Sequence, residues 1–99
     1  MSMAATELTF KQEGTGYLSE PVEVTGSAVA VRMELSEGGE TSLERSITGD
    51  NFLYECTITS STDKRKSLEF NISGCIPGQQ LRLRFGNAVP SKICVLQYE

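Results

Sequence analysis

The feature that most constrains the fold is a strict two-residue alternation of apolar and polar side chains. The segment Ala28–Leu35 reads AVAVRMEL and the segment Leu81–Phe85 reads LRLRF. Successive side chains of a β-strand point to opposite faces, so such segments bury one face and leave the other in water. Both segments are therefore predicted to be half-buried antiparallel strands.

Weaker copies of this pattern predict further strands over residues 8–11, 22–25, 43–47, 52–58, 68–72 and 91–98. Glycine-rich or charged turn segments separate them, and no apolar stripe has a helical period over a useful length. Eight strands at this spacing predict an all-β fold, a single antiparallel β-sandwich over residues 1–99. Its strand order is left open as jelly-roll or immunoglobulin-like, with a small barrel as the alternative. Residues 1–5 are expected to form a flexible N-terminus.

Two of the weaker strands carry specific expectations. The segment 52–58 is predicted to turn one stripe inward, made of Phe52, Tyr54, Cys56 and Ile58. The last strand is apolar on both faces, so its phase is ambiguous. An apolar outer face usually marks a contact with another chain. We therefore expect an interface on the face that carries Cys94, Leu96 and Tyr98.

Length and charge exclude several classes of protein. Ninety-nine residues fit one domain, and the formal net charge is −4. The acidic excess lies in residues 1–49, and the long-range field would repel phosphate, so we predict no nucleic-acid partner. No run of about 18 apolar residues occurs, so no membrane partner is predicted. The start of the chain shows no secretory signal, which favours a cytoplasmic or virion location in a bacterial host.

The residues available for chemistry are few. The chain has no histidine, which removes the commonest general base and zinc ligand. Its three cysteines, at positions 56, 75 and 94, are too far apart in sequence for a C-x-x-C site and are expected to be reduced and mostly buried. No calcium-loop or phosphate-loop motif is present. The sequence therefore predicts no enzyme, no metal and no cofactor.

Three further residues are candidates for binding. Arg82 and Arg84 are predicted to point outward from one strand, where they could join the basic turn 63–66 in a stripe that contacts the acidic half of another copy. Tyr17, predicted to lie in a loop after Gly14-Thr15-Gly16, is the one loop-placed aromatic residue and a candidate ligand contact.

Two stretches carry a resemblance to a known class of protein. They are ATELTFK at residues 5–11 and CIPGQQLRLRF at residues 75–85. With the run of short strands between them, they resemble small all-β proteins encoded by phages and prophages of gut bacteria, related members of which are auxiliary or decoration proteins of tailed-phage heads. The resemblance implies a structural role, contact with a capsid protein and no catalytic residues.

The sequence thus favours a non-enzymatic structural or interaction protein that self-associates, with a capsid protein as a second expected partner. The alternative interpretation is a carbohydrate- or surface-binding β-sandwich module of a secreted protein. That alternative predicts an exposed aromatic platform or a bound calcium ion, whereas the first predicts an apolar surface of the folded domain.

Overall fold

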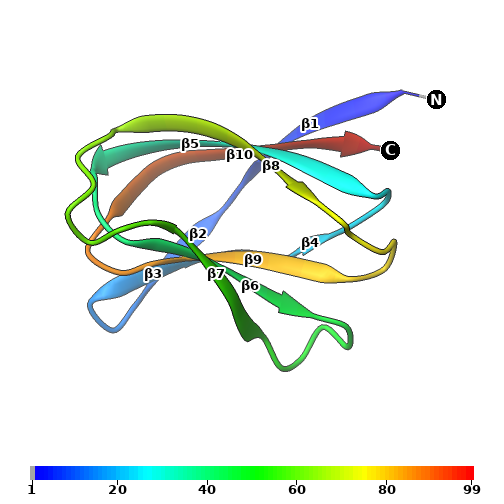
Figure 1. Ribbon diagram of the computed structural model, residues 1–99, viewed down its shortest axis with the longest axis horizontal. Helices are drawn as coiled ribbons and strands as arrows, with labels where there is room; N and C mark the ends of the chain where they lie inside the picture. Colours follow the sequence, from blue (N-terminus) through cyan, green and yellow to red (C-terminus); the bar gives the residue numbers. More distant parts are fainter. Residues whose placement is uncertain (1) are drawn as a thin grey trace.

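The structure, a computed structural model, describes residues 2–99 and is built from strands joined by turns (Figure 1). The described residues contain no helix, so none is long and apolar enough to cross a membrane. The strands are β1 (Met3–Leu8), β2 (Phe10–Glu13), β3 (Gly16–Ser19), β4 (Val22–Glu23), β5 (Ala28–Glu37), β6 (Thr41–Ser46), β7 (Leu53–Thr59), β8 (Ser67–Ser73), β9 (Gln80–Phe85) and β10 (Val89–Tyr98).

Two antiparallel sheets pack against each other as a β-sandwich, which confirms the predicted fold class. Sheet A has the strand order β1-β10-β5-β8. Sheet B has the order β2-β3-β9-β6-β7, and β4 pairs with β9 beside β3. The two sheets are not closed on each other, so the barrel alternative is wrong.

The strand order is that of a jelly roll. β1 and β2 are one passage of the chain that bends at Thr9, and β3 and β4 are a second passage interrupted at Pro21. Along the chain, the first passage pairs with the last, β3 and β4 pair with β9, β5 pairs with β8, and β6 pairs with β7. These pairings form one long hairpin in which the first half of the chain runs beside the second half. When this hairpin is rolled up so that β10 also pairs with β5 and β9 with β6, the two sheets of a jelly roll result. The immunoglobulin-like order is therefore excluded.

The hydrophobic core lies between the sheets and follows the predicted alternation of the two clearest strands. On β5 and β9 every second side chain is buried, while Arg32 on β5 is exposed. The buried members of these two strands are Val29, Val31, Met33, Leu35, Leu81, Leu83 and Phe85. Burying one face of each strand removes the apolar surface from water and fixes the register of both sheets.

Glu20 holds the bend between β1 and β2. Its carboxylate accepts hydrogen bonds from the N–H of Thr9, at 3.1 Å, and from the Thr9 hydroxyl. The N–H of Glu20 donates to the carbonyl of Thr9 at 2.9 Å. The hydroxyl bond, followed by the backbone bond, holds the pKa of Glu20 below its ordinary value. These contacts fix the point at which the first passage leaves sheet A and enters sheet B.

A serine side chain completes the sheet at the break between β3 and β4. After Ser19 the chain turns away from β9 at Glu20 and Pro21. The N–H of Leu83 in β9 therefore has no backbone partner on the side of β3 and β4. This N–H donates to Ser19 Oγ at 2.9 Å, and the Ser19 hydroxyl donates to the carbonyl of Glu20 at 3.0 Å. Ser19 is buried, so its hydroxyl satisfies a donor that water does not reach.

We expect Ser19→Ala to lower the free energy of unfolding by about 1–3 kcal/mol, because the buried N–H of Leu83 is left without an acceptor. Urea denaturation followed by circular dichroism measures the change. The matched control is Ser36→Ala, since the Ser36 hydroxyl makes only an exposed 3.3 Å bond to the carbonyl of Val89. That control should change the free energy by less than about 0.5 kcal/mol. Equal effects of the two substitutions would contradict the role given to Ser19.

Two expectations about the first strands are corrected. Residues 3–5 belong to β1 instead of a flexible N-terminus, because their backbone pairs with β10 in a regular ladder; Met1 lies outside the described residues. Residues 16–19, expected as a loop around Tyr17, form strand β3. The sequence therefore predicted eight passages, but its strands 8–11 and 22–25 left out most of β1 and all of β3.

The expected inward stripe of residues 52–58 is correct for Ile58, which packs against the core, and wrong for Tyr54. β7 is an edge strand of sheet B, and Tyr54 on it is 64% exposed. Its register with β6 passes from Cys56 opposite Leu43 to Tyr54 opposite Glu44, so Glu55 is an extra residue. In a regular strand, residues two apart share a face, but an extra residue between them turns them to opposite faces. Tyr54 therefore lies on the outer face, as its partner Glu44 does. Cys56 lies on the inner face, as its partner Leu43 does, but it is exposed because few residues cover this edge strand.

Candidate functional site

The phase of β10 is settled by its position in the middle of sheet A. Ile93 and Val95 lie opposite Met33 and Val31 of β5 and are buried in the core. Cys94, Leu96 and Tyr98 therefore point to the outer face of the sheet. Leu96 is 39% exposed and Tyr98 is 42% exposed, while Cys94 is half-buried. The three residues expected on an apolar outer face thus lie on it together.

The neighbouring strands enlarge this face into a continuous apolar surface. Met3 lies opposite Tyr98, and Ala5 lies opposite Leu96 on one side, with Ala30 opposite Leu96 on the other. Met3 is 47% exposed. We call Met3, Ala5, Ala30, Leu96 and Tyr98 the outer patch. The sequence missed its β1 members because residues 1–5 were expected to be flexible.

A shallow hollow of about 160 Å³ opens in the outer patch. Ala30 has a small side chain between the longer Leu96 and Asn71, and the small Ala5 lies on the other side of Leu96, so the surface dips on both sides of Leu96. One rim is polar, where Arg32 donates to Glu69 at 2.5 Å. This ion pair is exposed and screened by solvent, so it contributes little to stability but bounds the apolar area.

Arg82 and Arg84 lie on the other sheet, away from the outer patch. Both point to the outer face of sheet B, as expected, but they do not form a free basic stripe. Arg82 Nε lies 2.5 Å from Glu44 Oε1, and Arg84 Nε lies 2.7 Å from Glu44 Oε2. Glu44 stands between the two because its strand, β6, pairs with β9 and brings it opposite Arg82. One buried carboxylate thus binds both guanidinium groups.

The electrostatics of Glu44 follow from this geometry. Burial raises the pKa of its carboxyl, but the hydrogen bonds from Arg84 and Arg82 and their positive charges more than compensate. The pKa of Glu44 therefore lies below its ordinary value. Arg82 also stacks on Phe52, with its guanidinium carbon 4.4 Å from the centre of the ring. These contacts are those of a structural ion cluster, and both arginines are already engaged.

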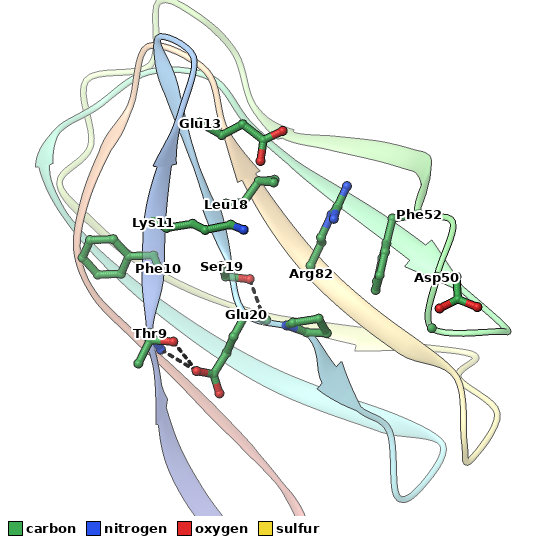
Figure 2. Close-up of a pocket in the computed structure, with 12 residues that line it drawn as sticks. Thr9, Phe10, Lys11, Glu13, Leu18, Ser19, Glu20, Asp50, Phe52 and Arg82 are labelled. Atoms are coloured by element: carbon green, nitrogen blue, oxygen red, sulfur yellow. Dashed lines mark hydrogen bonds between the residues drawn. The ribbon is translucent and has the colours of Figure 1, made fainter.

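A groove of about 460 Å³ lies beside this cluster (Figure 2). Its walls come from the β2–β3 hairpin and from the loop between β6 and β7, with Arg82 standing beside Phe52 and Lys11 on the opposite strand. Charged groups of both signs line it, the acidic Glu13, Glu20 and Asp50 together with the basic Lys11 and Arg82. Two aromatic residues line the groove: Phe10, which packs against the core and against Tyr17, and Phe52, whose ring is covered by Arg82.

Tyr17 does not line this groove. It lies in β3 opposite Phe85, on the inner side of sheet B, and packs against the core. Its ring meets that of Phe10 edge to face, with centroids 6.2 Å apart. The ring is half-buried in this packing, so the reason for expecting a ligand contact, an aromatic side chain displayed on a loop, no longer holds.

The cysteines differ in exposure, but none is bonded to another. Cys75 is buried, Cys94 is half-buried and Cys56 is exposed, so the expectation of mostly buried thiols is wrong for Cys56. Among residues 2–99, no three side chains of the kinds that bind metals are close enough together to hold an ion. The chain matches no known protein-family model, and no curated protein is significantly similar to it in sequence.

Proposed function

We propose that this chain is a non-enzymatic structural protein of a phage particle that self-associates through the outer patch of sheet A. The observation that supports this function is the continuous apolar surface over β1, β10 and β5. Leu96, Tyr98 and Met3 expose a large share of their side chains there. Exposed apolar areas that adjoin a polar rim are typical of protein–protein contacts.

The rest of the molecule suits such a role. The described groups with a shifted pKa, Glu20, Glu44, Asp63, Arg32 and Arg65, are all held in hydrogen bonds or ion pairs of the fold itself. Jelly rolls serve as capsid and lectin domains, so the fold is compatible with a place on a capsid, although a fold alone does not assign a function. On this proposal the chain acts in the virion or, before assembly, in the cytoplasm of the bacterial host.

Carbohydrate or surface binding is the other candidate, and it has less support. It requires an accessible aromatic platform, whereas Tyr17 packs on the core and the ring of Phe52 lies under Arg82. The groove beside Phe52 is lined by charges of both signs, and this mixed lining does not favour any one class of ligand.

The outer patch can be tested by placing a charge in it. We expect Leu96→Glu to lower the mass of the assembly measured by size-exclusion chromatography with light scattering at tens of micromolar, because a carboxylate cannot be buried there unpaired. The matched control is Ile47→Glu, since Ile47 is 80% exposed directly after β6 of sheet B, whereas the patch lies on sheet A. That variant should keep the mass of the unchanged protein. A protein that elutes as a 10.8 kDa monomer, or equal masses for both variants, would overturn the proposal.

The place of the chain on a virion needs a separate measurement. Particles purified from the bacterium that carries this sequence should contain the chain in amounts comparable with the shell protein when analysed by mass spectrometry. Its absence from particles that contain the other head proteins would remove the virion assignment and leave the self-association to be judged by light scattering.

A further inference from the structure

β1 forms an open edge of sheet A. It pairs with β10 on one side, and no strand in the described part of the chain pairs with it on the other. In Figure 1 it lies at the rim of the sheet beside β10, near both ends of the chain. An open edge presents unpaired N–H and C=O groups that can bond to another strand. A contact at this edge rests on the self-association proposed above and would be its second interface.

The hydrogen-bond pattern shows which residues face the open side. The N–H of Glu99 donates to the carbonyl of Ser2, so these two residues form a hydrogen-bonded pair of the β1–β10 ladder. Such pairs alternate in an antiparallel ladder. Ala4, Thr6 and Leu8 therefore turn their backbone groups to β10. The backbone groups of the alternate residues, Met3, Ala5 and Glu7, point away from the sheet.

The open edge ends at the bend. Thr9 is the next residue that faces away from β10, and its backbone groups are already satisfied. Its N–H donates to the Glu20 carboxylate, and its carbonyl accepts from the Glu20 N–H. The unpaired edge is therefore a short, defined run whose donors and acceptors belong to Met3, Ala5 and Glu7.

The other edges of the two sheets carry features that discourage strand pairing. β2 is only four residues long and includes Lys11 and Glu13. β7 contains the bulge at Glu55. β8 has a charged residue, Glu69, near its middle. Short length, bulges and charges are the devices by which edges avoid pairing with other chains.

β1 has little of this protection. Its ladder with β10 is regular over all six pairs, without a bulge, and it contains no proline. Its single charged residue, Glu7, stands near the end of the strand. Of β1, β2, β7 and β8, β1 is thus the strand best suited to accept another strand.

We infer that β1 pairs with β1 of a second copy, antiparallel, about a twofold axis that passes through Ala5. In this register Ala5 faces Ala5 of the second copy, and Met3 faces its Glu7. All three residues are at hydrogen-bonded positions, so every backbone group of the open edge gains a partner. No two carboxylates face each other, because each Glu7 stands opposite a methionine. A twofold pairing of this kind is self-complementary and closes at two copies.

The pairing joins the two copies of sheet A into one sheet that runs through both molecules. A twofold axis perpendicular to the sheet keeps outer faces on the same side, so the two outer patches become neighbours across the axis. Met3 of each copy then lies beside the edge of the other. The pair presents an apolar surface about twice as wide as one chain offers, so two pairs can bind each other through both outer patches at once, which strengthens the outer-patch contact by bivalency.

Amide hydrogen exchange tests the edge directly. We expect the N–H of Ala5 to exchange quickly in dilute protein and at least ~10-fold more slowly in concentrated protein, where it becomes bonded. The N–H of Ala4 is the internal control, because it bonds to β10 in either state. An Ala5 amide that exchanges quickly in an assembled sample would overturn the edge pairing and leave the outer-patch contact standing.

A pair of variants at one position complements this measurement. Glu7→Pro removes an N–H that β10 does not use, at a residue outside the outer patch, and proline is tolerated at sheet edges, so the fold should persist by circular dichroism. It should raise the dissociation constant of the pair by about 10-fold or more, whereas Glu7→Gln, which removes the charge but keeps the N–H, should not. With both contacts present, Leu96→Glu and Glu7→Pro each lower the assembly mass, and the double variant is a monomer. A mass lowered by Leu96→Glu alone would refute the edge pairing only; a mass lowered by Glu7→Pro alone would refute the outer-patch contact only.

Discussion

Phe85→Ala is expected to lower the free energy of unfolding by about 3–5 kcal/mol, because it removes the largest of the fully buried side chains in the core. Phe85 is 1% exposed and lies on β9, the central strand of sheet B, between Tyr17 of β3 and Thr41 of β6. Removing the ring loses its transfer free energy and leaves a cavity, which the paired strands on both sides cannot close. For a domain of this size the change corresponds to a fall in melting temperature of about 4–8 °C per kcal/mol.

Urea denaturation gives the free energy, and calorimetry gives the melting temperature. The control is Ile47→Ala, because Ile47 is as apolar but 80% exposed, and its truncation should cost less than about 0.5 kcal/mol. If Phe85→Ala and Ile47→Ala had similar effects, the core could not lie between the sheets as described.

The second large effect is expected at Glu44. Replacing it with alanine leaves Arg82 and Arg84, two residues apart on one strand face, without their shared counter-ion. Breaking a buried ion pair costs about 3–5 kcal/mol. Arg84 keeps a 41% exposed side chain, so water screens part of this cost, and we expect about 2 kcal/mol. Glu34→Ala is the control, since its ion pair with Arg32 is exposed and 3.6 Å long.

The same carboxylate makes stability depend on pH. The pKa of Glu44 is lower in the folded protein than in the unfolded chain, so the unfolded state binds the proton first as the pH falls. Its contribution is therefore complete above the unfolded pKa, near 4.5, and is lost as the pH falls through the folded pKa. In Glu44→Gln the free energy of unfolding should fall less steeply below about pH 5 than in the unchanged protein. Parallel acid profiles for the two proteins would contradict the assignment.

The sequence predicts the fold class well where one strand face is apolar and the other polar. β5 and β9 are such strands, and their buried residues could be named from the alternation alone. β10 is apolar on both faces, so its phase depends on its neighbours in the sheet. Those neighbours are β1 and β5, which are distant in sequence, and local alternation carries no information about them.

The candidate site shows the same division. The outward direction of Arg82 and Arg84 follows from the period of β9, but their partner Glu44 becomes visible only when β6 is known to lie beside β9. The error over residues 52–58 has a different cause. Two extra residues in β7, Ile58 and Glu55, each shift the phase of the strand, so no two-residue period can hold across it.

The central place of β10 also affects when the protein can fold. β10 occupies the second position of sheet A, between β1 and β5, although it is formed by residues 89–98. On a ribosome, β1 emerges early and has no neighbour until those residues have been synthesised and released. Pairings between segments so distant in sequence give a high contact order, for which folding takes milliseconds to seconds. Sheet A therefore closes only after translation has passed residue 98, and until then the β1 strand is unpaired along both sides.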